Sequence, residues 1–325
     1  MGEASVRVVF FGSPEYALPT LRALLAAADC EVVAVVTQPD RRRGRSGRAL
    51  PTPVKALALQ SGVPVLEPQR LGRDETAQLA ALRPDLGVVA ASGHILPSHL
   101  LAAFPRHVLN VHASLLPRHR GASAVASAIL AGDAESGATI MRVVREIDAG
   151  PLLGQARTPI EPLDTTATLT ARIAELGAAL LLQLLPRWVA GEIEATPQDE
   201  SQATYAPKLS RADSLLDWSR PAVELWRRVR AFQPWPAATA SYGDEPLTVH
   251  AAWPLAATPG APPGSVLAGD GAPLTPLLPG RAARAVVACG EGALTLLRVQ
   301  RPGRRAVEIE QYLNGDPALI GARLG

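Results

Sequence analysis

The sequence predicts an α/β protein with two domains: a doubly wound, mostly parallel, Rossmann-like sheet and a smaller C-terminal β-barrel domain. Roughly the first 150 residues alternate short β-branched runs with helical patterns, which is typical of a parallel sheet covered by helices. The 325 residues are too many for one ordinary core. The last part of the chain has short apolar runs separated by Gly and Pro turns, which indicates a small β domain.

In the first domain, apolar runs rich in β-branched residues predict buried strands at Val6–Phe11, Glu31–Thr37, Leu86–Ala90, Val108–His112 and Ala138–Val143. Helical spacing over Tyr16–Ala27 joins the first two strands into a βαβ unit with a right-handed crossover. A long helix rich in Ala and Leu is expected over Thr168–Val189, packed on this domain and ended by Gly191.

We place the first domain at residues 1–191, a polar linker at 192–210 and the second domain at 211–325. In the second domain a helix is expected over Arg220–Phe232, followed by strands in Leu247–Ala252, Ala285–Ala288 and Ala293–Val299. A compact OB-like barrel that presents a face to oligonucleotides fits these runs, although their spacing alone does not separate a barrel from a sandwich.

Composition and charge exclude several classes of protein. With 47% apolar and 19% charged residues, the chain is not largely disordered. The two cysteines, Cys30 and Cys289, fit neither a disulfide framework nor a four-ligand zinc site. We find no signal peptide and no run of roughly 20 apolar residues, so we expect a cytoplasmic protein without a membrane segment. The net charge of +2 does not by itself identify a nucleic-acid partner.

Two polar side chains share one face at the end of a predicted strand. Asn110 and His112 flank Val111, and strand side chains alternate, so both leave the sheet on the same side. In an open α/β sheet the carboxyl ends of strands border the ligand crevice, where an amide and an imidazole could polarise a carbonyl group. Taken alone, an Asn-x-His pattern is more often structural, with Asn110 bonding a turn and His112 satisfied in the core.

Asp148, in the turn from Glu146 to Pro151, is an acidic candidate. An isolated Asp in such a place is more often a turn or cap residue than a catalytic one.

A basic loop follows the second strand and contains Arg41, Arg42, Arg43, Arg45 and Arg48. Most charge runs of this kind are solvated surface. Arginine also pairs bidentately with phosphates and stacks on unpaired bases, so the loop is a candidate nucleic-acid contact. A second basic surface that could follow a phosphate backbone is expected in the C-terminal domain, from Arg281, Arg284, Arg298, Arg301, Arg304 and Arg305.

The order of the motifs resembles that of the methionyl-tRNA formyltransferases over nearly the whole chain. The N-terminal motifs are Phe11–Ala17 (FGSPEYA), Thr37–Asp40 (TQPD), Asn110–His112 (NVH), Ser114–Gly121 (SLLPRHRG) and Asp148–Gly150 (DAG). The C-terminal ones are Tyr205–Leu209 (YAPKL), Asp217–Trp218 (DW), Arg230–Pro236 (RAFQPWP) and Tyr312–Gly315 (YLNG). The N-terminal motifs alone are shared with other 10-formyltetrahydrofolate enzymes, including glycinamide ribonucleotide and sugar-nucleotide formyltransferases.

This resemblance implies an enzyme of translation initiation that moves a formyl group from 10-formyltetrahydrofolate, its co-substrate, to the α-amino group of methionyl initiator tRNA. No metal is implied. Asn110, His112 and Asp148 match the catalytic residues. Asn110 and a protonated His112 would donate hydrogen bonds to the formyl oxygen, where negative charge develops, and Asp148 would support the charged imidazole and the proton transfer from the amine.

The resemblance also implies the binding residues. The folate would lie against Ser114, Leu115, Leu116 and Pro117 and against a second loop with Ser92, Gly93, Ile95 and Leu96. Ser92 stands where relatives usually carry an aromatic residue, and Ala124 where they carry Pro. The tRNA would contact Arg41, Arg42, Arg43, Arg45 and Arg48, with Arg45 matching the most important arginine of the family, and also Arg304 and Arg305. We expect a monomer.

Two other functions fit part of the sequence. A sugar-nucleotide formyltransferase would use the same folate chemistry on a different amine, but the arginine loop and the basic C-terminal domain argue against it. A nucleic-acid-binding protein with a relic catalytic fold fits the basic elements, but the presence of Asn110, His112 and Asp148 argues against it.

Overall fold

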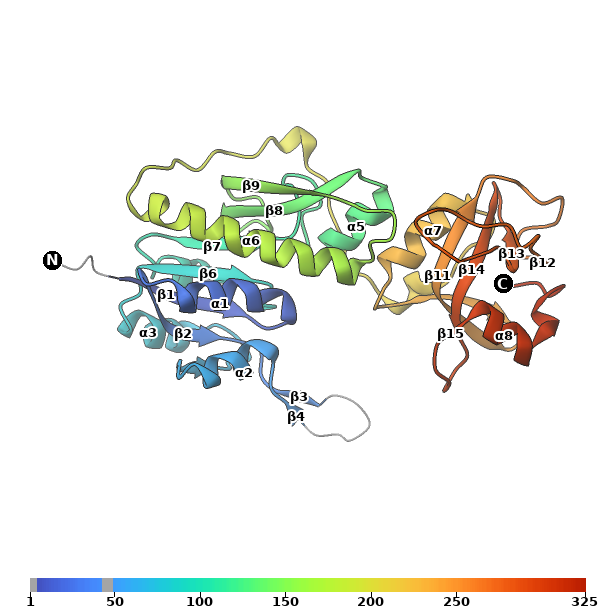
Figure 1. Cartoon of the computed structure of the whole chain (residues 1–325). Helices are drawn as coiled ribbons and strands as arrows, with labels where there is room; N and C mark the ends of the chain where they lie inside the picture. Colours follow the sequence, from blue (N-terminus) through green and yellow to red (C-terminus); the bar gives the residue numbers. More distant parts are fainter. Residues whose placement is uncertain (1–4, 43–48) are drawn as a thin grey trace. The chain divides into compact units, whose positions relative to one another are not determined.

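The computed structural model describes residues 5–42 and 49–325. By its internal contacts the chain divides into two compact units. Unit 1 is formed by the chain up to Ala124, by Glu135–Pro159 and by Leu169–Pro207. Unit 2 is formed by Val125–Ala134, Ile160–Thr168 and Lys208–Gly325. Figure 1 labels most of the helices and strands.

Unit 1 is built on a seven-stranded sheet with the order β5-β2-β1-β6-β7-β8-β9. The strands are β1 (Val6–Gly12), β2 (Cys30–Val36), β5 (Val65–Leu66), β6 (Leu86–Ala90), β7 (Val108–His112), β8 (Glu135–Arg142) and β9 (Leu152–Pro159). The first five strands in this order are parallel, and β8 and β9 are antiparallel to their neighbours. The predicted, mostly parallel sheet is confirmed, with an antiparallel edge that the sequence did not reveal.

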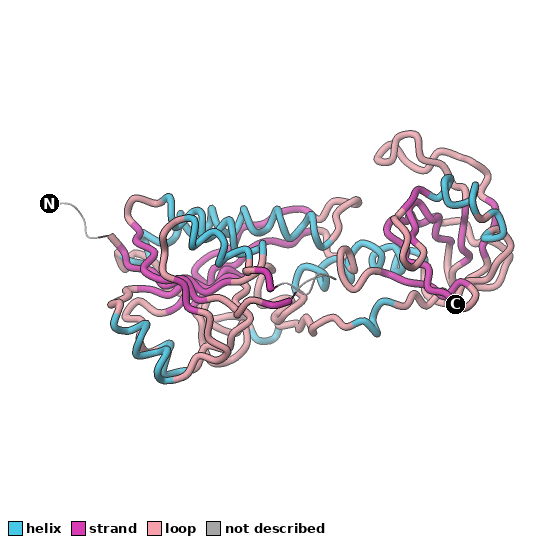
Figure 2. Tube along the Cα trace, turned by 90° about the horizontal axis from the view of Figure 1, so that it is seen from below, coloured by secondary structure: helices cyan, strands magenta, loops and turns pink. Residues whose placement is uncertain are grey.

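Helices cover both faces of this sheet because alternate side chains of each central strand point to opposite sides. On one face, Val8 and Phe10 of β1 pack with α1 (Leu18–Ala26), α2 (Pro53–Gln60) and α6 (Thr166–Val189). On the other, Val9 and Phe11 pack with α3 (Arg73–Ala81) and α4 (Ser98–Leu101). In Figure 2 the strands of unit 1 are seen gathered between helices.

Among the helices of the described residues, α6 alone is long and apolar enough to cross a membrane by length and composition. Half of its most apolar window is buried inside the protein. Leu181 and Leu185 belong to the core on the α1 side of the sheet, so α6 is the core helix that the Ala- and Leu-rich run predicts. Gly191, with a φ of 74°, follows its end as expected.

A two-stranded hairpin, β3 (Arg41–Arg42) and β4 (Ala49–Leu50), forms the stem of the arginine loop. Arg43, Arg45 and Arg48, which the sequence makes candidate tRNA contacts, lie outside the described residues.

Unit 2 contains an antiparallel sheet of β10 (Ala238–Tyr242), β11 (Glu245–Leu255), β14 (Ala293–Gln300), β13 (Ala285–Ala288) and β12 (Val266–Ala268) in that order, with β15 (Val307–Glu308) paired to β14. Its helices include α7 (Ala222–Ala231) and α8 (Ile309–Gly315), and α5 (Ala124–Ala131) begins at the end of a unit 1 segment. Short 3-10 turns lie at Glu15–Ala17 and Glu200–Gln202, at Arg211–Ser214, and at Pro317–Leu319.

The end of the chain joins the two outer strands of this sheet. Gly325 and Ser241 of β10 exchange backbone hydrogen bonds of 2.7 and 3.0 Å. On the other edge, the Val266 amide of β12 donates to the Ala322 carbonyl at 2.9 Å, and the Gly321 amide donates to the Val266 carbonyl at 2.8 Å. The sheet therefore closes on itself as a barrel does, which separates the two arrangements that the sequence left open.

Unit 2 also includes two segments that come before its main part in the sequence, Val125–Ala134 and Ile160–Thr168. The buried Arg230 of α7 donates to the carbonyls of Glu161 and Asp164, both at 3.2 Å, and its guanidinium lies 3.8 Å from the ring centre of Trp226. Thr166 donates to the Ala231 carbonyl at 2.6 Å. These contacts link segments far apart in sequence, which local patterns cannot reveal.

Candidate active site

Asn110 and His112 lie at the carboxyl end of β7, in unit 1. Leu109 and Val111 point into the core on the α1 side, so the two polar residues between and after them leave the sheet on the opposite side. His112 is buried, with 8% of its surface exposed, and Asn110 is partly exposed. The sequence expectation that they share one face is confirmed.

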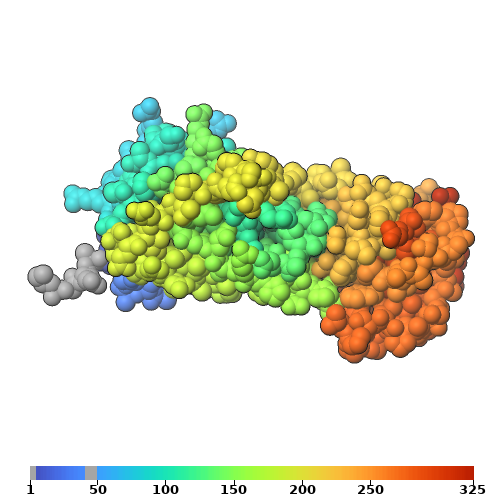
Figure 3. Space-filling view, turned by 90° about the horizontal axis from the view of Figure 1, so that it is seen from above, coloured from blue at the N-terminus to red at the C-terminus, as the bar shows by residue number. Residues whose placement is uncertain are grey.

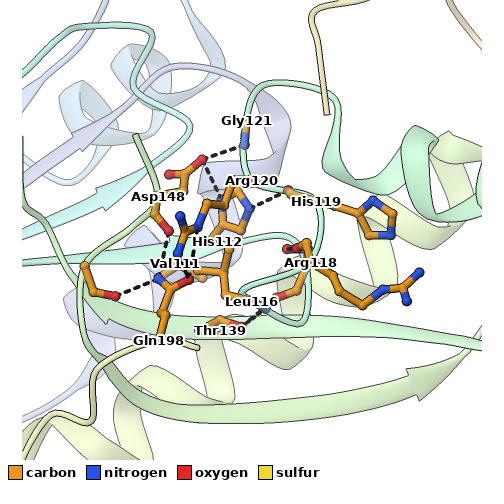
Figure 4. Close-up of polar contacts among 12 residues, drawn as sticks. Val111, His112, Leu116, Arg118, His119, Arg120, Gly121, Thr139, Asp148 and Gln198 are labelled. Atoms are coloured by element: carbon orange, nitrogen blue, oxygen red, sulfur yellow. Dashed lines mark hydrogen bonds and ion pairs between the residues drawn. The ribbon is translucent and has the colours of Figure 1, made fainter. Parts of the chain in front are cut away.

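His112 is held between two oxygens. Its Nδ1 lies 3.6 Å from Oδ2 of Asp148, and its Nε2 lies 3.2 Å from the backbone carbonyl of His119. Figure 4 shows these three residues around the imidazole ring. A carbonyl oxygen can only accept a hydrogen bond, so Nε2 carries a proton and donates. Nδ1, the other ring nitrogen, faces the Asp148 carboxylate.

Asp148 reaches His112 through a loop that turns back along β7. Strand β8 is antiparallel, and Arg142 near its end pairs with Leu109, three residues before His112. The loop must therefore return by about 10 Å, the length of three strand residues. Asp148 itself has a φ of 51°, a left-handed conformation that costs a non-glycine residue on the order of 1 kcal/mol.

The backbone amide of Gly121 donates to Oδ2 of Asp148 at 2.8 Å, so this one oxygen serves both Gly121 and His112. For Oδ1 we find no hydrogen bond to any described residue. The carboxylate thus has one oxygen fixed by the protein and one with remaining capacity to accept a proton or bind water.

Arg120 lies in the core of this site rather than on its surface. Only 2% of its surface is exposed, and its guanidinium donates to Oε1 of Gln198 and to both carboxylate oxygens of Glu200. The hydrogen bonds with Glu200 raise the pKa of Arg120 and lower that of Glu200. The sequence suggests a linker at 192–210, but its residues up to Pro207 belong to unit 1. In Figure 3 the yellow residues near position 200 lie against green residues.

The loop proposed to hold the folate is fixed by buried hydrogen bonds. Oγ1 of Thr139 in β8 donates to the Ser114 carbonyl at 2.6 Å and accepts from the Leu116 amide at 3.2 Å. Gln155 of β9 donates to the Leu116 carbonyl at 2.7 Å. The side chains of Ser114 and Leu116 are themselves buried, and Ser114 donates to the Arg118 carbonyl at 2.7 Å.

Leu115 and Pro117 are the partly exposed residues of the same loop, so they are better placed than Ser114 and Leu116 to touch a ligand. Neither Thr139 nor Gln155 was a candidate from the sequence. A Thr and a Gln on apolar strands are a weak signal that could have been noticed.

The second candidate folate loop follows β6, beside β7 at the same edge of the parallel sheet. Ser92 is buried, and its Oγ accepts a hydrogen bond of 3.0 Å from the His94 amide. Gly93 has a φ of 75°, which explains why glycine suits that position. Leu96 packs partly on the core, whereas Ile95 is 91% exposed.

The arginines of the proposed tRNA surface in unit 2 fall into two groups. Arg281 forms an ion pair with Glu308, and Arg301 pairs with Asp316 at 2.5 Å and donates to the Tyr312 hydroxyl at 2.9 Å. These two contribute less free charge than the sequence suggests. Arg284, Arg298, Arg304 and Arg305 are exposed, as is the paired Arg301.

Within residues 5–42 and 49–325, no group of three or more His, Cys, Asp or Glu side chains has an arrangement that could hold a metal ion.

Unit 1 is a mostly parallel sheet with polar residues at its carboxyl edge, and unit 2 contains an antiparallel sheet; this fold is similar to that of solved formyltransferases. The formyl transferase family matches residues 6–185, and the C-terminal domain of formyl transferases matches residues 208–317. Among solved structures, the N-formyltransferase of Helicobacter canadensis in complex with folinic acid and dTDP-3-aminofucose has a TM-score of 0.66 and 16% identity, over 91% of this chain and 99% of that chain. At that identity the likeness shows the fold alone.

Full-length relatives are much more similar. The methionyl-tRNA formyltransferase of Methylococcus capsulatus is 47% identical over 98% of this chain and 100% of its own length. That of Pseudomonas fluorescens is 46% identical over 98% of this chain and 97% of its own length. The chain belongs to the formyl transferase family and, within it, to the methionyl-tRNA formyltransferases.

Proposed function

We propose that this protein transfers the formyl group of 10-formyltetrahydrofolate to the α-amino group of methionyl initiator tRNA through Asn110, His112 and Asp148. The observation that carries this proposal is the pair formed by the buried His112 and the partly buried Asp148, with Nδ1 and Oδ2 3.6 Å apart, beside Asn110 at the end of β7. The full-length identity to methionyl-tRNA formyltransferases supports the choice of substrate.

The amine nitrogen attacks the formyl carbon, and negative charge develops on the formyl oxygen. The Asn110 amide donates to that oxygen, as does the Nε2 proton of His112, which exchanges its hydrogen bond of 3.2 Å with the His119 carbonyl for this one. Asp148 faces the imidazole with Oδ2, and its Oδ1 takes the amine proton directly or through a water molecule. The bond between the formyl carbon and N10 then breaks, N10 receives the proton that Asp148 had taken from the amine, and tetrahydrofolate and the formylated amine leave.

The folate is expected to lie between the loop of Leu115 and Pro117 and the loop of Gly93 and Ile95. An exposed Ile95 beside the site offers apolar surface for a ring system. We expect the acceptor end of the tRNA to lie at the arginine loop, whose stem is the hairpin of β3 and β4. We expect Arg304 and Arg305 to bind phosphates of the tRNA.

The substrate is tested by incubating the purified protein and 10-formyltetrahydrofolate with methionyl initiator tRNA or with an amino-sugar nucleotide. We expect formylation of the tRNA. Formylation of the sugar alone would overturn the proposed substrate while leaving the chemistry intact.

The catalytic residues are tested by Asn110→Ala and His112→Ala, which we expect to lower kcat by at least about a hundredfold because each removes a donor to the developing oxyanion. Asp148→Asn should be similarly impaired, since the imidazolium loses its counter-charge. His99→Ala, in the exposed part of α4, is the matched control and should behave as wild type. Losses below about threefold in the Asn110 and His112 variants would remove both residues from the mechanism.

A further inference from the structure

Gln198 lies between the Asp148 turn and the buried Arg120, and every hydrogen-bonding site of its amide is used. Its Nε2 donates to the carbonyls of Asp148 and Gly150, at 2.8 and 2.7 Å. Its Oε1 accepts from Nε and Nη2 of Arg120, at 3.1 and 2.8 Å. A carboxamide offers two donors and two acceptor positions, so none is left for another partner.

These bonds close a ring around Asp148. Arg120 is followed directly by Gly121, whose amide donates to Oδ2 of Asp148. Gln198 joins the guanidinium of Arg120 to the backbone carbonyl of Asp148. Residues 120 and 121 therefore hold Asp148 twice: Gly121 binds its side chain, and Arg120 is linked to its main chain through Gln198. Figure 4 shows the dashed lines of this ring.

The turn that Gln198 closes is not stable on local grounds. Asp148 has a φ of 51°, and a Cβ on Gly150 would lie 1.7 Å from the Arg142 carbonyl, so the backbone there is both left-handed and tightly packed. Gln198, which lies outside this loop, stabilises its conformation by donating hydrogen bonds to the carbonyls of Asp148 and Gly150. The other end of the anchor is also fixed, because the Arg120 amide donates to the Thr204 carbonyl and the Ala206 amide donates to the Arg120 carbonyl.

We propose that Gln198 is a positioning residue: by holding the Asp148 turn against Arg120, it sets the carboxylate at the distance from His112 that formyl transfer requires. Gln198 contributes no group to the reacting atoms in this role. The proposal rests on the proposed function of Asp148, and its effect should therefore appear in kcat and not in substrate binding.

The first variant is Gln198→Glu, which keeps acceptors for Arg120 but replaces the amide donors by oxygens that face two carbonyls. The second is Gln198→Met, which has a similar length and no polar atoms. The control is Glu200→Gln, which weakens the other partner of Arg120 without touching the Asp148 turn. Thermal unfolding shows which variants are folded.

We expect both Gln198 variants to lose about tenfold or more in kcat with KM values for both substrates within about twofold of wild type, the split expected for a defect in the transition state. In an Asp148→Ala background the same substitutions should cost less than about twofold, because the residue they act through is gone. Wild-type kcat in both single variants, or an equal loss in the Asp148→Ala background, would overturn the proposal.

Hydrogen exchange at the Gly121 amide gives a readout that needs no activity, because that amide donates to the Asp148 carboxylate. Gln198→Glu should accelerate its exchange about tenfold, and Glu200→Gln should leave it within about twofold of wild type. An unchanged rate in Gln198→Glu contradicts the positioning role. A wild-type protein that does not formylate methionyl-tRNA contradicts the proposed function instead, and the exchange measurement still decides the role of Gln198.

Discussion

The candidate catalytic side chains are oriented mainly by backbone groups. A carbonyl fixes the proton on Nε2 of His112, and an amide fixes one oxygen of Asp148. Strand alternation makes Asn110 and His112 candidates from the sequence, and the resemblance to formyltransferases implies their catalytic role and that of Asp148. The partners His119 and Gly121 could not be inferred, since any residue supplies a carbonyl and any residue except proline supplies an amide.

Lys55 is one of two lysines in a chain whose other long basic residues are all arginine. Its Nζ lies 2.9 Å from Asp40, directly before β3, and 2.7 Å from Glu67. Hydrogen bonds to Glu67 first, and then to Asp40, raise the pKa of Lys55, and its hydrogen bond lowers the pKa of Asp40. Through its ion pair with Asp40, Lys55 therefore links α2 to the start of the hairpin of β3 and β4 that carries the arginine loop.

We expect Lys55→Met to raise KM for methionyl-tRNA several-fold, because the hairpin that is proposed to meet the acceptor arm loses one anchor, while kcat changes little. Steady-state kinetics with varied tRNA measure this. Lys208→Met, the other lysine, exposed in unit 2, controls for loss of one positive charge. Equal KM values in the two variants would show that the anchor is not needed.

At the scale of elements, strands with a strong apolar pattern are predictable and short ones are not. The predicted bounds of β6, β7 and β13 agree with the structure to the residue. Strands β5 and β15 have two residues each, too few to show any periodicity. The sequence of β8 does not state that this strand pairs antiparallel with both β7 and β9, and the eight-residue β9 was not among the predicted strands.

The loop that follows β7 is fixed by β8, its neighbour in the sheet, and this yields a prediction. Thr139→Val leaves the Leu116 amide and the Ser114 carbonyl without their partner in a buried place, which costs about 1–3 kcal/mol of stability for each group left unsatisfied. We also expect KM for the folate to rise, since Leu115 and Pro117 lie on the loosened loop. Unfolding in urea and steady-state kinetics measure the two effects.

Thr295→Val is the matched control for that experiment. Thr295 is equally buried in a strand, but in unit 2, and it makes one hydrogen bond of 3.3 Å to the Ala285 carbonyl. Its loss should destabilise the protein less and leave KM for the folate unchanged. If the Thr139 variant binds folate as wild type does, the loop does not form the folate wall.

At the scale of the whole molecule, the chain has two compact units, and unit 2 gathers segments from both halves of the sequence. A truncation after Gly191 would remove Gln198 and Glu200 from unit 1 and would also leave Ile160–Thr168 without the partners Arg230 and Ala231. Point variants are therefore a cleaner test of tRNA binding than truncation.

Arg304 and Arg305 are exposed near β15, and we expect them to bind tRNA phosphates. Replacing both by Gln should weaken methionyl-tRNA binding and reduce the dependence of log Kd on log salt concentration by about 0.7 to 0.9 for each phosphate that is no longer neutralised. Binding is measured over a range of salt concentrations. Arg187→Gln in α6 is the control, because it makes the same Arg-to-Gln change away from the proposed tRNA surface. An unchanged salt dependence in the double variant would remove these two residues from the tRNA surface.

The order of the amino acids was enough to predict the α/β domain followed by a β domain, the exact bounds of β6, β7 and β13, the shared face of Asn110 and His112, and the family to which the chain belongs. These features depend on local periodicity and on residue types in a fixed order, both of which are written in the chain. Three features could be seen only in the tertiary structure. Asp148 lies beside His112, and the buried Arg120 donates to Gln198 and Glu200. The last residues of the chain close the unit 2 sheet. Such contacts join residues from 36 to 84 positions apart, and which of them form depends on the packing of the whole fold.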